Sequence, residues 1–231
     1  MKTIGMLGGM SWESTAVYYQ LLNRAAQARL GGVASAKLVI YSFDFAEIAA
    51  MQQTGHWDEA NRRMADAAQG LERAGADLVI MCCNTMHCAT QEIEAAIRVP
   101  FLHIADPLGA AIKAAGLTRI GLVGSRHTME QDGILLGRLR RSHGLDVIVP
   151  EGDDFAEANR VIYDELVRGQ FLDPSRDRYR KIIAGLVARG AQGVILGCTE
   201  LPILLRKEEA AVPLFDTTTL HAAAALDAAL A

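Results

Sequence analysis

The sequence lacks the features of an exported or membrane-bound protein. Its first residues carry one lysine and a short apolar stretch, Thr3–Gly9, without the longer apolar region and small-residue cleavage site of a signal peptide. No run of about 18 apolar residues could cross a bilayer. Only four residues are cysteine, and three of them lie within seven positions, which is not a disulfide framework. These absences predict a cytoplasmic protein with reduced thiols and no membrane partner.

An excess of positive charge is also absent. The chain has 23 Lys and Arg residues against 27 Asp and Glu residues, a net charge of −4. Domains that bind nucleic acid usually carry a basic surface, so no nucleic-acid partner is expected. With 231 residues, of which 51% are hydrophobic, the composition is that of a folded globular protein with one large or two small domains.

Short apolar segments alternate with amphipathic segments along the whole chain. The near-continuous apolar runs predict strands of a parallel sheet that is covered on both faces: Thr3–Leu7, Lys37–Phe43, Leu78–Cys82, Phe101–Ile104, Arg119–Val123, Asp146–Val149, Gly193–Leu196 and Leu214–Phe215. The amphipathic segments predict helices: Ser14–Arg29, Trp57–Arg73, Thr85–Ile97, Leu108–Ala115, Thr128–Ser142, Phe155–Arg168, Ser175–Arg189 and Thr219–Leu230. This alternation predicts an α/β fold with mainly parallel sheets flanked by helices.

Three blocks of sequence occur twice, in the same order and at a nearly constant spacing of 113 to 116 residues. LERAGADLVIMCC, ending at Cys83, matches LVARGAQGVILGC, ending at Cys198. IGMLG matches IGLVG, and Val99-Pro matches Val212-Pro. The repeat predicts two similar domains related by a pseudo-two-fold axis, each with one cysteine at the equivalent place.

Each repeated cysteine directly follows an apolar strand and precedes a helix. In open parallel sheets, ligands bind beyond the carboxyl ends of the strands. The amino end of a helix there attracts a carboxylate, and the same field favours thiolate over thiol. Further polar side chains follow the two cysteines: Asn84 and Thr85 in the first half, Thr199 and Glu200 in the second. Each half therefore predicts a reactive sulfur beside an anion-binding turn.

Two thiols on opposite sides of one carbon would suit a particular reaction. Inverting a stereocentre requires a proton to leave one face and another to arrive at the opposite face. Two monoprotic groups, one deprotonated and one protonated, can do this in both directions. Cys83 and Cys198 are therefore predicted to be the two acid–base residues of a racemase.

The segments around these cysteines resemble the aspartate/glutamate racemase family. They are GMLGGMSWEST near the start, CCNTMH at Cys82–His87 and GCTE at Gly197–Glu200, and the similarity extends over nearly the whole chain. It is greatest to the broad-specificity amino-acid racemases. The resemblance implies an isomerase of amino acids that needs no pyridoxal phosphate or other cofactor, an active site between two similar α/β domains, and a homodimer. It also implies domains 1–99 with 212–231 and 100–211, because the last strand and helix return to the first domain.

The resemblance assigns roles to individual residues. Cys83 and Cys198 become the catalytic pair, and the substrate-binding set is Met10, Gln52, Asn84, Thr85, Thr128, Thr199 and Glu200. One departure concerns specificity. Archaeal-type aspartate racemases hold the distal carboxylate with an arginine after the second strand, whereas Phe43–Gln53 contains no Arg or Lys. This difference argues against a strictly aspartate-specific pocket and leaves neutral polar amino acids open.

The other two thiols and the nearby histidine are predicted to have no direct role in catalysis. Cys82 and Cys88 are predicted to pack in the core, and His87 is predicted to be structural or to support the site from behind rather than to be a third acid–base group. No metal is expected, because no CxxC pair is present and adjacent cysteines on a strand point apart. Two other functions stay open on the same fold. One is a decarboxylase or isomerase of small dicarboxylic acids that uses a single thiol, and the other is a non-catalytic carboxylate-binding protein.

Overall fold

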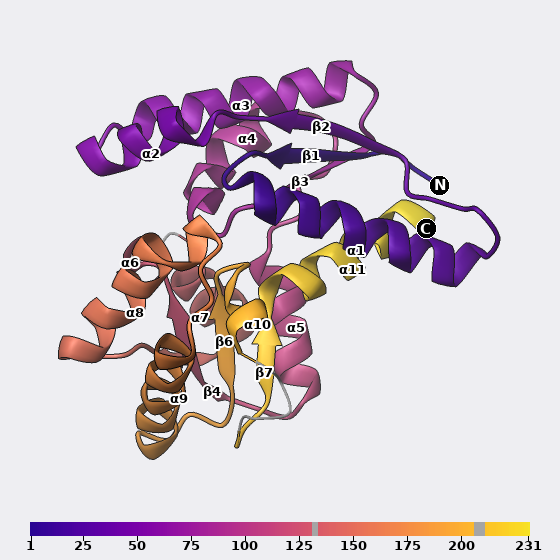
Figure 1. The fold of residues 1–231 in the computed structure, drawn as a ribbon. Coiled ribbons are helices and arrows are strands. Elements are labelled where there is room, and N and C mark those ends of the chain that lie inside the picture. Colours follow the sequence, from indigo (N-terminus) through magenta and orange to yellow (C-terminus); the bar gives the residue numbers. More distant parts are fainter. Residues whose placement is uncertain (131–133, 206–210) are drawn as a thin grey trace. The chain divides into compact units, whose positions relative to one another are not determined.

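Figure 1 shows the computed structural model, which describes residues 1–130, 134–205 and 211–231. The chain divides into two compact units, Met1–Ile104 with His221–Ala231, and Ala105–Leu220. Each unit is built on its own parallel sheet. The chain therefore passes between the units twice, after Ile104 and after Leu220, compared with the predicted boundaries at 99 and 211.

The first unit contains a sheet of order β2-β1-β3, in which all strands are parallel. Its strands are β1 (Ile4–Gly8), β2 (Leu38–Ser42) and β3 (Leu78–Met81). Helices pack on both faces of this sheet (Figure 1). One face is covered by α1 (Trp12–Leu30) and α11 (Thr217–Leu230), and the other by α2 (Phe45–Thr54), α3 (Trp57–Arg73) and α4 (Thr90–Ala96). A short 3-10 helix, η1 (Thr85–Ala89), precedes α4.

Side chains of β3 alternate between these two faces, as successive residues of a strand must. Ile80 and Cys82 lie in the apolar cluster beneath α1 and α11. Met81 and Cys83 lie with the cluster beneath α2, α3 and α4. The prediction that the two adjacent cysteines point apart is confirmed.

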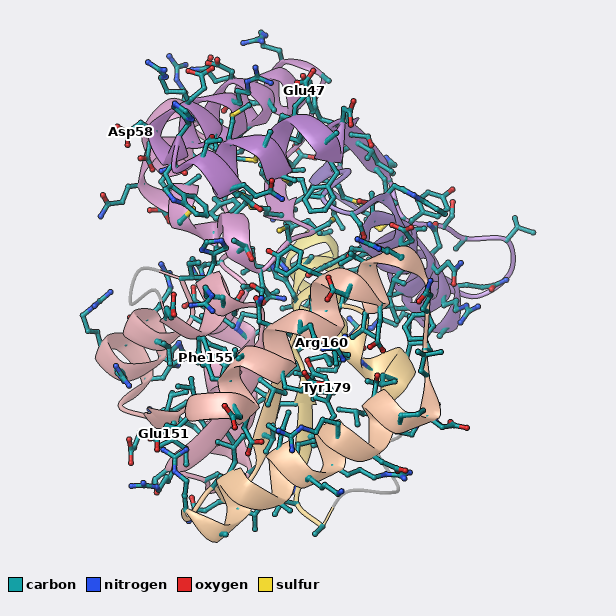
Figure 2. The ribbon with its side chains drawn as sticks, turned by 60° about the vertical axis from the view of Figure 1, so that its left-hand side comes forward. Glu47, Asp58, Glu151, Phe155, Arg160 and Tyr179 are labelled. Atoms are coloured by element: carbon teal, nitrogen blue, oxygen red, sulfur yellow. The ribbon has the colours of Figure 1, made fainter. Side chains whose placement is uncertain are left out.

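The second unit contains a parallel sheet of order β5-β4-β6-β7. Its strands are β4 (Arg119–Gly124), β5 (Asp146–Ile148), β6 (Val194–Gly197) and β7 (Leu214–Asp216). Its helices are α5 (Ala105–Ala114), α6 (Arg126–Glu130), α7 (Leu136–His143), α8 (Gly152–Asp164), η2 (Leu166–Arg168), α9 (Asp173–Ala188) and α10 (Leu201–Leu204). Helices α8 and α9 pack against β4, and Tyr179 of α9, labelled in Figure 2, donates a 2.7 Å hydrogen bond to the carbonyl of Ala158 in α8.

Equivalent contacts recur inside the two units. The backbone N–H of Thr3 donates to Asp77 Oδ2 at 2.6 Å, and that of Thr118 donates to Gln192 Oε1 at 2.8 Å. Both partners are offset by 115 residues, the spacing of the cysteine block. In both sheets the first strand of the half lies between the second and the third. The internal duplication predicted from the sequence is confirmed.

A glycine near the start of each half allows another equivalent contact, between the central strand and a long helix. A Cβ added to Gly5 would come within 3.1 Å of Leu71 Cβ, and one added to Gly121 within 3.3 Å of Leu186 Cβ. Leu71 on α3 and Leu186 on α9 are equivalent residues of the repeat. The glycines let the long helix of each half approach the central strand closely.

The expectation that the last strand returns to the first domain is wrong. β7 pairs with β6 in the second sheet, with Leu214 opposite Val194. In the first unit, Phe101 lies opposite Val79, the residue equivalent to Val194, but only as an isolated bridge rather than a strand Phe101–Ile104. The repeated Val-Pro blocks explain both pairings. In each half, the residues that follow Val-Pro lie beside the strand that precedes the cysteine of the same half. Only α11, from His221 onward, belongs to the first unit.

Other predicted elements also change at their boundaries. Helix α2 was not predicted from the sequence. In the structure, Asp44 Oδ1 accepts the Ala46 N–H at the start of this helix, and Gly55 adopts a left-handed conformation at its end. The single helix predicted over Thr128–Ser142 is divided into α6 and α7. Thr128 and Gln131 have the spacing of a capping box, which predicts that a helix starts at Thr128. Thr128 instead lies inside α6, and Gln131 lies outside the described residues.

Candidate active site

The turn after β3 carries the first predicted catalytic residue. The backbone N–H of Cys82 still donates to Leu7 in β1 at 2.9 Å, and the chain then leaves the sheet at Cys83. Cys83 is partly exposed, whereas Asn84 and Thr85, the next two residues, are largely buried. A thiol at this end of a parallel strand lies where the sequence analysis places it.

Two further predicted residues reach the same part of the first unit. Met10, in the turn after β1, and Met86, in η1, belong to the apolar cluster against which Cys83 packs. Gln52 of α2 is buried and donates from Nε2 to Met86 Sδ at 3.2 Å. The first unit therefore brings Met10 and Gln52 to the apolar cluster beside the Cys83 turn.

The turn after β6 carries the second predicted catalytic residue and a buried carboxylate. Cys198 Sγ donates to Glu200 Oε2 at 2.9 Å, and Thr199 Oγ1 donates to the same oxygen at 2.7 Å. Glu200 is 6% exposed, and Cys198 is partly exposed. The sulfur is the donor in this hydrogen bond, and the carboxylate oxygen is the acceptor. The equivalent of Glu200 in the first half is Thr85, so a carboxylate occupies only the second turn.

Thr128 lies beside this second turn. A Cβ added to Gly197, the residue before Cys198, would come within 3.3 Å of Thr128 Cγ2. The second unit therefore brings together Thr128, Cys198, Thr199 and Glu200. Thr128 itself is fully buried, and its Oγ1 lies 3.0 Å from Ser125 Oγ.

The sequence analysis missed the counterpart of Thr128 in the first half. Ser11 Oγ lies 3.3 Å from Ser14 Oγ and accepts the Ser14 N–H at the start of α1. Ser125 Oγ accepts the Thr128 N–H in the same way at the start of α6. Ser14 and Thr128 therefore make the same contact in two similar turns, and the Ser-x-x-Ser and Ser-x-x-Thr patterns are the sequence signal that relates them.

Neither remaining thiol is suited to acid–base chemistry near neutral pH. Burial raises the pKa of Cys82 well above its usual value, and the charge of Cys83 adds to the shift. Burial likewise raises the pKa of Cys88 to about 12, and its Sγ donates to Asn61 Oδ1 at 3.4 Å. Both residues pack in the core of the first unit, as predicted.

Both ring nitrogens of His87 are used by backbone groups, which agrees with the prediction that it is not a third acid–base group. It is completely buried in η1, and both of its ring nitrogens have backbone partners, Cys83 O at 2.8 Å and Ile104 N at 3.2 Å. Burial lowers the pKa of His87 well below its usual value, and the neighbouring His103 and His221 lower it further. The imidazole is therefore neutral at physiological pH and has no nitrogen left for a substrate.

Over residues 1–130, 134–205 and 211–231, no three or more His, Cys, Asp or Glu side chains are grouped so as to hold a metal ion. Among the helices of those same ranges, none combines the length and the apolar character needed to cross a bilayer.

Comparisons with known proteins point to one family. The family model described as Asp/Glu/Hydantoin racemase matches residues 7–225. The broad-specificity amino-acid racemase RacX of Bacillus subtilis is 23% identical over 99% of this chain and 98% of its own. A crystal structure described as a candidate Asp/Glu racemase from Yersinia pestis is 48% identical with a TM-score of 0.94, and each chain is covered completely. That of an aspartate racemase homologue from Pyrococcus horikoshii is 31% identical with a TM-score of 0.87, again over both whole chains.

Proposed function

The chain belongs to the Asp/Glu/hydantoin racemase family and is an amino-acid racemase, and we propose that it inverts the α-carbon of its substrate with Cys83 and Cys198 as opposed acid–base thiols and without a cofactor. In this proposal both turns contact one amino-acid molecule. The observation that carries it is the duplication. The two units each place a partly exposed thiol at the carboxyl end of the equivalent strand, β3 or β6, with hydroxyl or amide side chains beside it.

The proposed reaction moves two protons. The thiolate of one cysteine takes the α-proton as the Cα–H bond breaks, and the electron pair passes into the substrate carboxylate. The other thiol then gives its proton to the opposite face of Cα, which restores a tetrahedral centre of inverted configuration. The two sulfurs exchange protonation states, so the enzyme in its new state accepts the other enantiomer.

The polar side chains of the turns are proposed to stabilise the negative charge of the substrate. Asn84, Thr85, Thr128 and Thr199 supply neutral donors for the α-carboxylate, whose charge increases while the α-proton is absent. Met10 and Gln52 line the pocket. Glu200 is proposed to act on Cys198 as well as on the substrate, because its carboxylate accepts the hydrogen bond from that sulfur.

The proposed substrates include neutral amino acids. The segment after β2, from Phe43 to Gln53, carries no Arg or Lys. Without a cation there, a second carboxylate would lose its hydration and gain no ion pair from α2. A pocket with Met10 and Gln52 suits a short polar side chain at least as well as that of aspartate.

Heavy water provides the direct test of this function. The purified chain, without added cofactor, is incubated in deuterium oxide with single L- and D-amino acids. Loss of optical activity together with one deuterium at Cα is the expected result, because each inversion draws a proton from solvent-exchanged thiol. Circular dichroism and mass spectrometry measure the two quantities. Retention of the α-proton for every amino acid tested would contradict the racemase mechanism, and release of carbon dioxide would indicate the single-thiol decarboxylase.

We also propose that the protein is a homodimer in the cytoplasm, whose reducing conditions keep thiols available. The edge strand β2 and helix α1 form an apolar groove of about 350 Å³ that includes Trp12, Tyr19 and Ile40. These three side chains are 68%, 50% and 40% exposed. Exposed apolar groups along an unpaired sheet edge favour association, and a second copy can offer the same surface about a two-fold axis.

Sedimentation measurements test the dimer. The wild-type chain is expected to sediment at twice its mass of 24.9 kDa, and Tyr19→Glu at the mass of one chain. Val33→Glu is the matched control, because Val33 is also apolar and fully exposed but does not line the groove. A monomeric wild type, or a Tyr19→Glu variant that stays dimeric, would show that this groove is not the interface. Cell fractionation tests the location.

A further inference from the structure

Three histidines and a tyrosine form a buried cluster in the first unit, next to the Cys83 turn. The ring of His87 lies 4.7 Å from that of His103 and 5.8 Å from that of His221, and Tyr18 lies 5.7 Å from His221. His87, His221 and Tyr18 are completely buried, and His103 is 2% exposed. Burial of several imidazoles is costly unless their nitrogens are hydrogen-bonded, so the partners of each ring define its role.

The contacts of His87 fix its tautomer. The Ile104 N–H can only donate, so His87 Nε2, 3.2 Å away, must be an unprotonated acceptor. The proton of the neutral ring is then on Nδ1, which donates to the carbonyl oxygen of Cys83 at 2.8 Å. His87 therefore connects the backbone of Cys83 to Ile104, the last residue before the chain passes into the second unit.

His221 has the opposite tautomer and different partners. Its Nε2 lies 2.8 Å from the carbonyl oxygen of Leu102 and must donate, so Nδ1 accepts the 2.9 Å hydrogen bond from the Tyr18 hydroxyl. None of these contacts involves Cys83. His221 thus shares the burial and the cluster of His87, but these two hydrogen bonds join it to Tyr18 and Leu102.

The carbonyl groups of Cys83 and Cys198 accept hydrogen bonds from different kinds of donor. Strand β3 ends at Met81, and the carbonyl of Cys83 accepts from the His87 side chain. In the second half the carbonyl of Cys198 accepts a backbone N–H from Leu201 at 3.2 Å, and the residue equivalent to His87 is Pro202. Proline has no side-chain donor. The two thiols are therefore held by different means.

We propose that His87 is a positioning residue for Cys83. The Nδ1–H donor fixes the Cys83 carbonyl and thereby directs the sulfur toward the α-proton of the substrate. This inference rests on the proposed function. Small displacements of a reacting group are sufficient to slow a reaction strongly, so this hydrogen bond has a measurable effect without touching the substrate.

Two substitutions separate the two hydrogen bonds of His87. The amide nitrogen of Asn in His87→Asn can replace Nδ1 and keep the bond to Cys83 O, while the bond to Ile104 is lost. The longer side chain in His87→Gln can replace Nε2 as the acceptor for Ile104, while the donor to Cys83 is lost. We expect His87→Gln to lower kcat by at least about tenfold with little change in KM, and His87→Asn to retain most of kcat.

The reactivity of the thiol itself supplies a second measurement. Iodoacetamide labelling, followed by peptide mass spectrometry, gives the rate at Cys83 and, as an internal reference, at Cys198. In His87→Gln the rate at Cys83 should change by several-fold while that at Cys198 stays constant. This result does not depend on racemisation, so it tests the positioning of Cys83 even if the proposed function is wrong.

His221→Gln is the matched control, because it makes the same change in a buried histidine of the same cluster. It should lower the midpoint of thermal unfolding as much as His87→Gln does, and leave kcat and the labelling rate at Cys83 near those of the wild type. Equal losses of kcat in His87→Gln and His221→Gln would overturn the proposal and reduce His87 to a stabilising residue. An unchanged labelling rate and kcat in His87→Gln would overturn it as well.

Discussion

Replacing either Cys83 or Cys198 by serine is expected to lower kcat for racemisation by about 10³-fold or more, the upper part of the range attributed to a general acid or base. A hydroxyl keeps the size and hydrogen-bonding capacity of the thiol, but it is a much weaker acid and its anion is not populated near neutral pH. One remaining thiol can take the α-proton only from the face toward which it points. The proton then returns to the same face, and the configuration is unchanged.

Each single variant should therefore retain one partial reaction. In deuterium oxide, Cys83→Ser should exchange the α-proton of the enantiomer that presents it to Cys198, and Cys198→Ser should exchange that of the other enantiomer. Proton magnetic resonance of separate L- and D-samples measures both rates. Opposite preferences in the two variants would assign each sulfur to one face of the substrate.

Cys88→Ser provides the control for this series. The residue lies in the same unit as Cys83, its thiol donates to Asn61 Oδ1 at 3.4 Å, and a hydroxyl can make the same hydrogen bond. Racemisation should continue at nearly the wild-type rate. The assignment fails for whichever residue, Cys83 or Cys198, can be replaced by serine with racemisation preserved, and a loss in all three variants would point to a general effect of the substitution on folding.

Local patterns in the sequence were sufficient for much of the fold. The opposite orientation of Cys82 and Cys83 follows from the period of a strand, and the duplicated sheets follow from blocks repeated about 115 residues apart. The repeat also contained the correct pairing of β7, since Val212-Pro is the counterpart of Val99-Pro. The resemblance to known racemases, applied to whole domains, instead assigned this strand to the first domain, whereas it belongs to the sheet of the second unit.

Features that depend on side-chain conformation were beyond the sequence. His87 bonds to Ile104, seventeen residues away, and no periodicity specifies which nitrogen meets which backbone group. Helix α2 shows how tertiary packing decides an element, because Ile48 and Gln52 are buried in a segment with little helical pattern of its own. The hydrogen bond from Cys198 Sγ to Glu200 Oε2 likewise depends on side-chain conformation. The tetrapeptide GCTE supplies the residues, and their rotamers decide whether the carboxylate turns toward the sulfur or away from it.

The hydrogen bond between Cys198 and Glu200 predicts a large effect of Glu200→Gln on the rate of racemisation. We expect the hydrogen bond to Glu200 Oε2 to keep the proton on Cys198, which in the proposed mechanism makes Cys198 the acid and Cys83 the base of the resting enzyme. An amide of the same shape removes the negative charge that opposes a thiolate at 2.9 Å. Cys198 would then lose its proton more readily, so more molecules would hold two thiolates and fewer would hold the required pair of one thiol and one thiolate. We expect kcat/KM to fall by about 10²-fold, within the range for a misplaced acid–base group.

The labelling rates distinguish this explanation from a damaged fold. Iodoacetamide reacts with thiolate, so Glu200→Gln should increase the rate at Cys198 and leave Cys83 unchanged, whose turn carries Thr85 in the equivalent place. Glu165→Gln is the matched control, because Glu165 is another buried carboxylate of the second unit, bonded to Arg160 and Ser175. It should alter stability and neither labelling rate.

The two enantiomers supply a final constraint on Glu200→Gln. They have equal free energies in water, so kcat/KM must remain equal for L- and D-substrate in any active variant, and the predicted loss must appear in both directions. The individual kcat values need not be equal, because they depend on which protonation state accumulates. A slower labelling of Cys198 in Glu200→Gln would mean that the carboxylate helps to remove the proton rather than to keep it there. Cys198, and not Cys83, would then be the base of the resting enzyme.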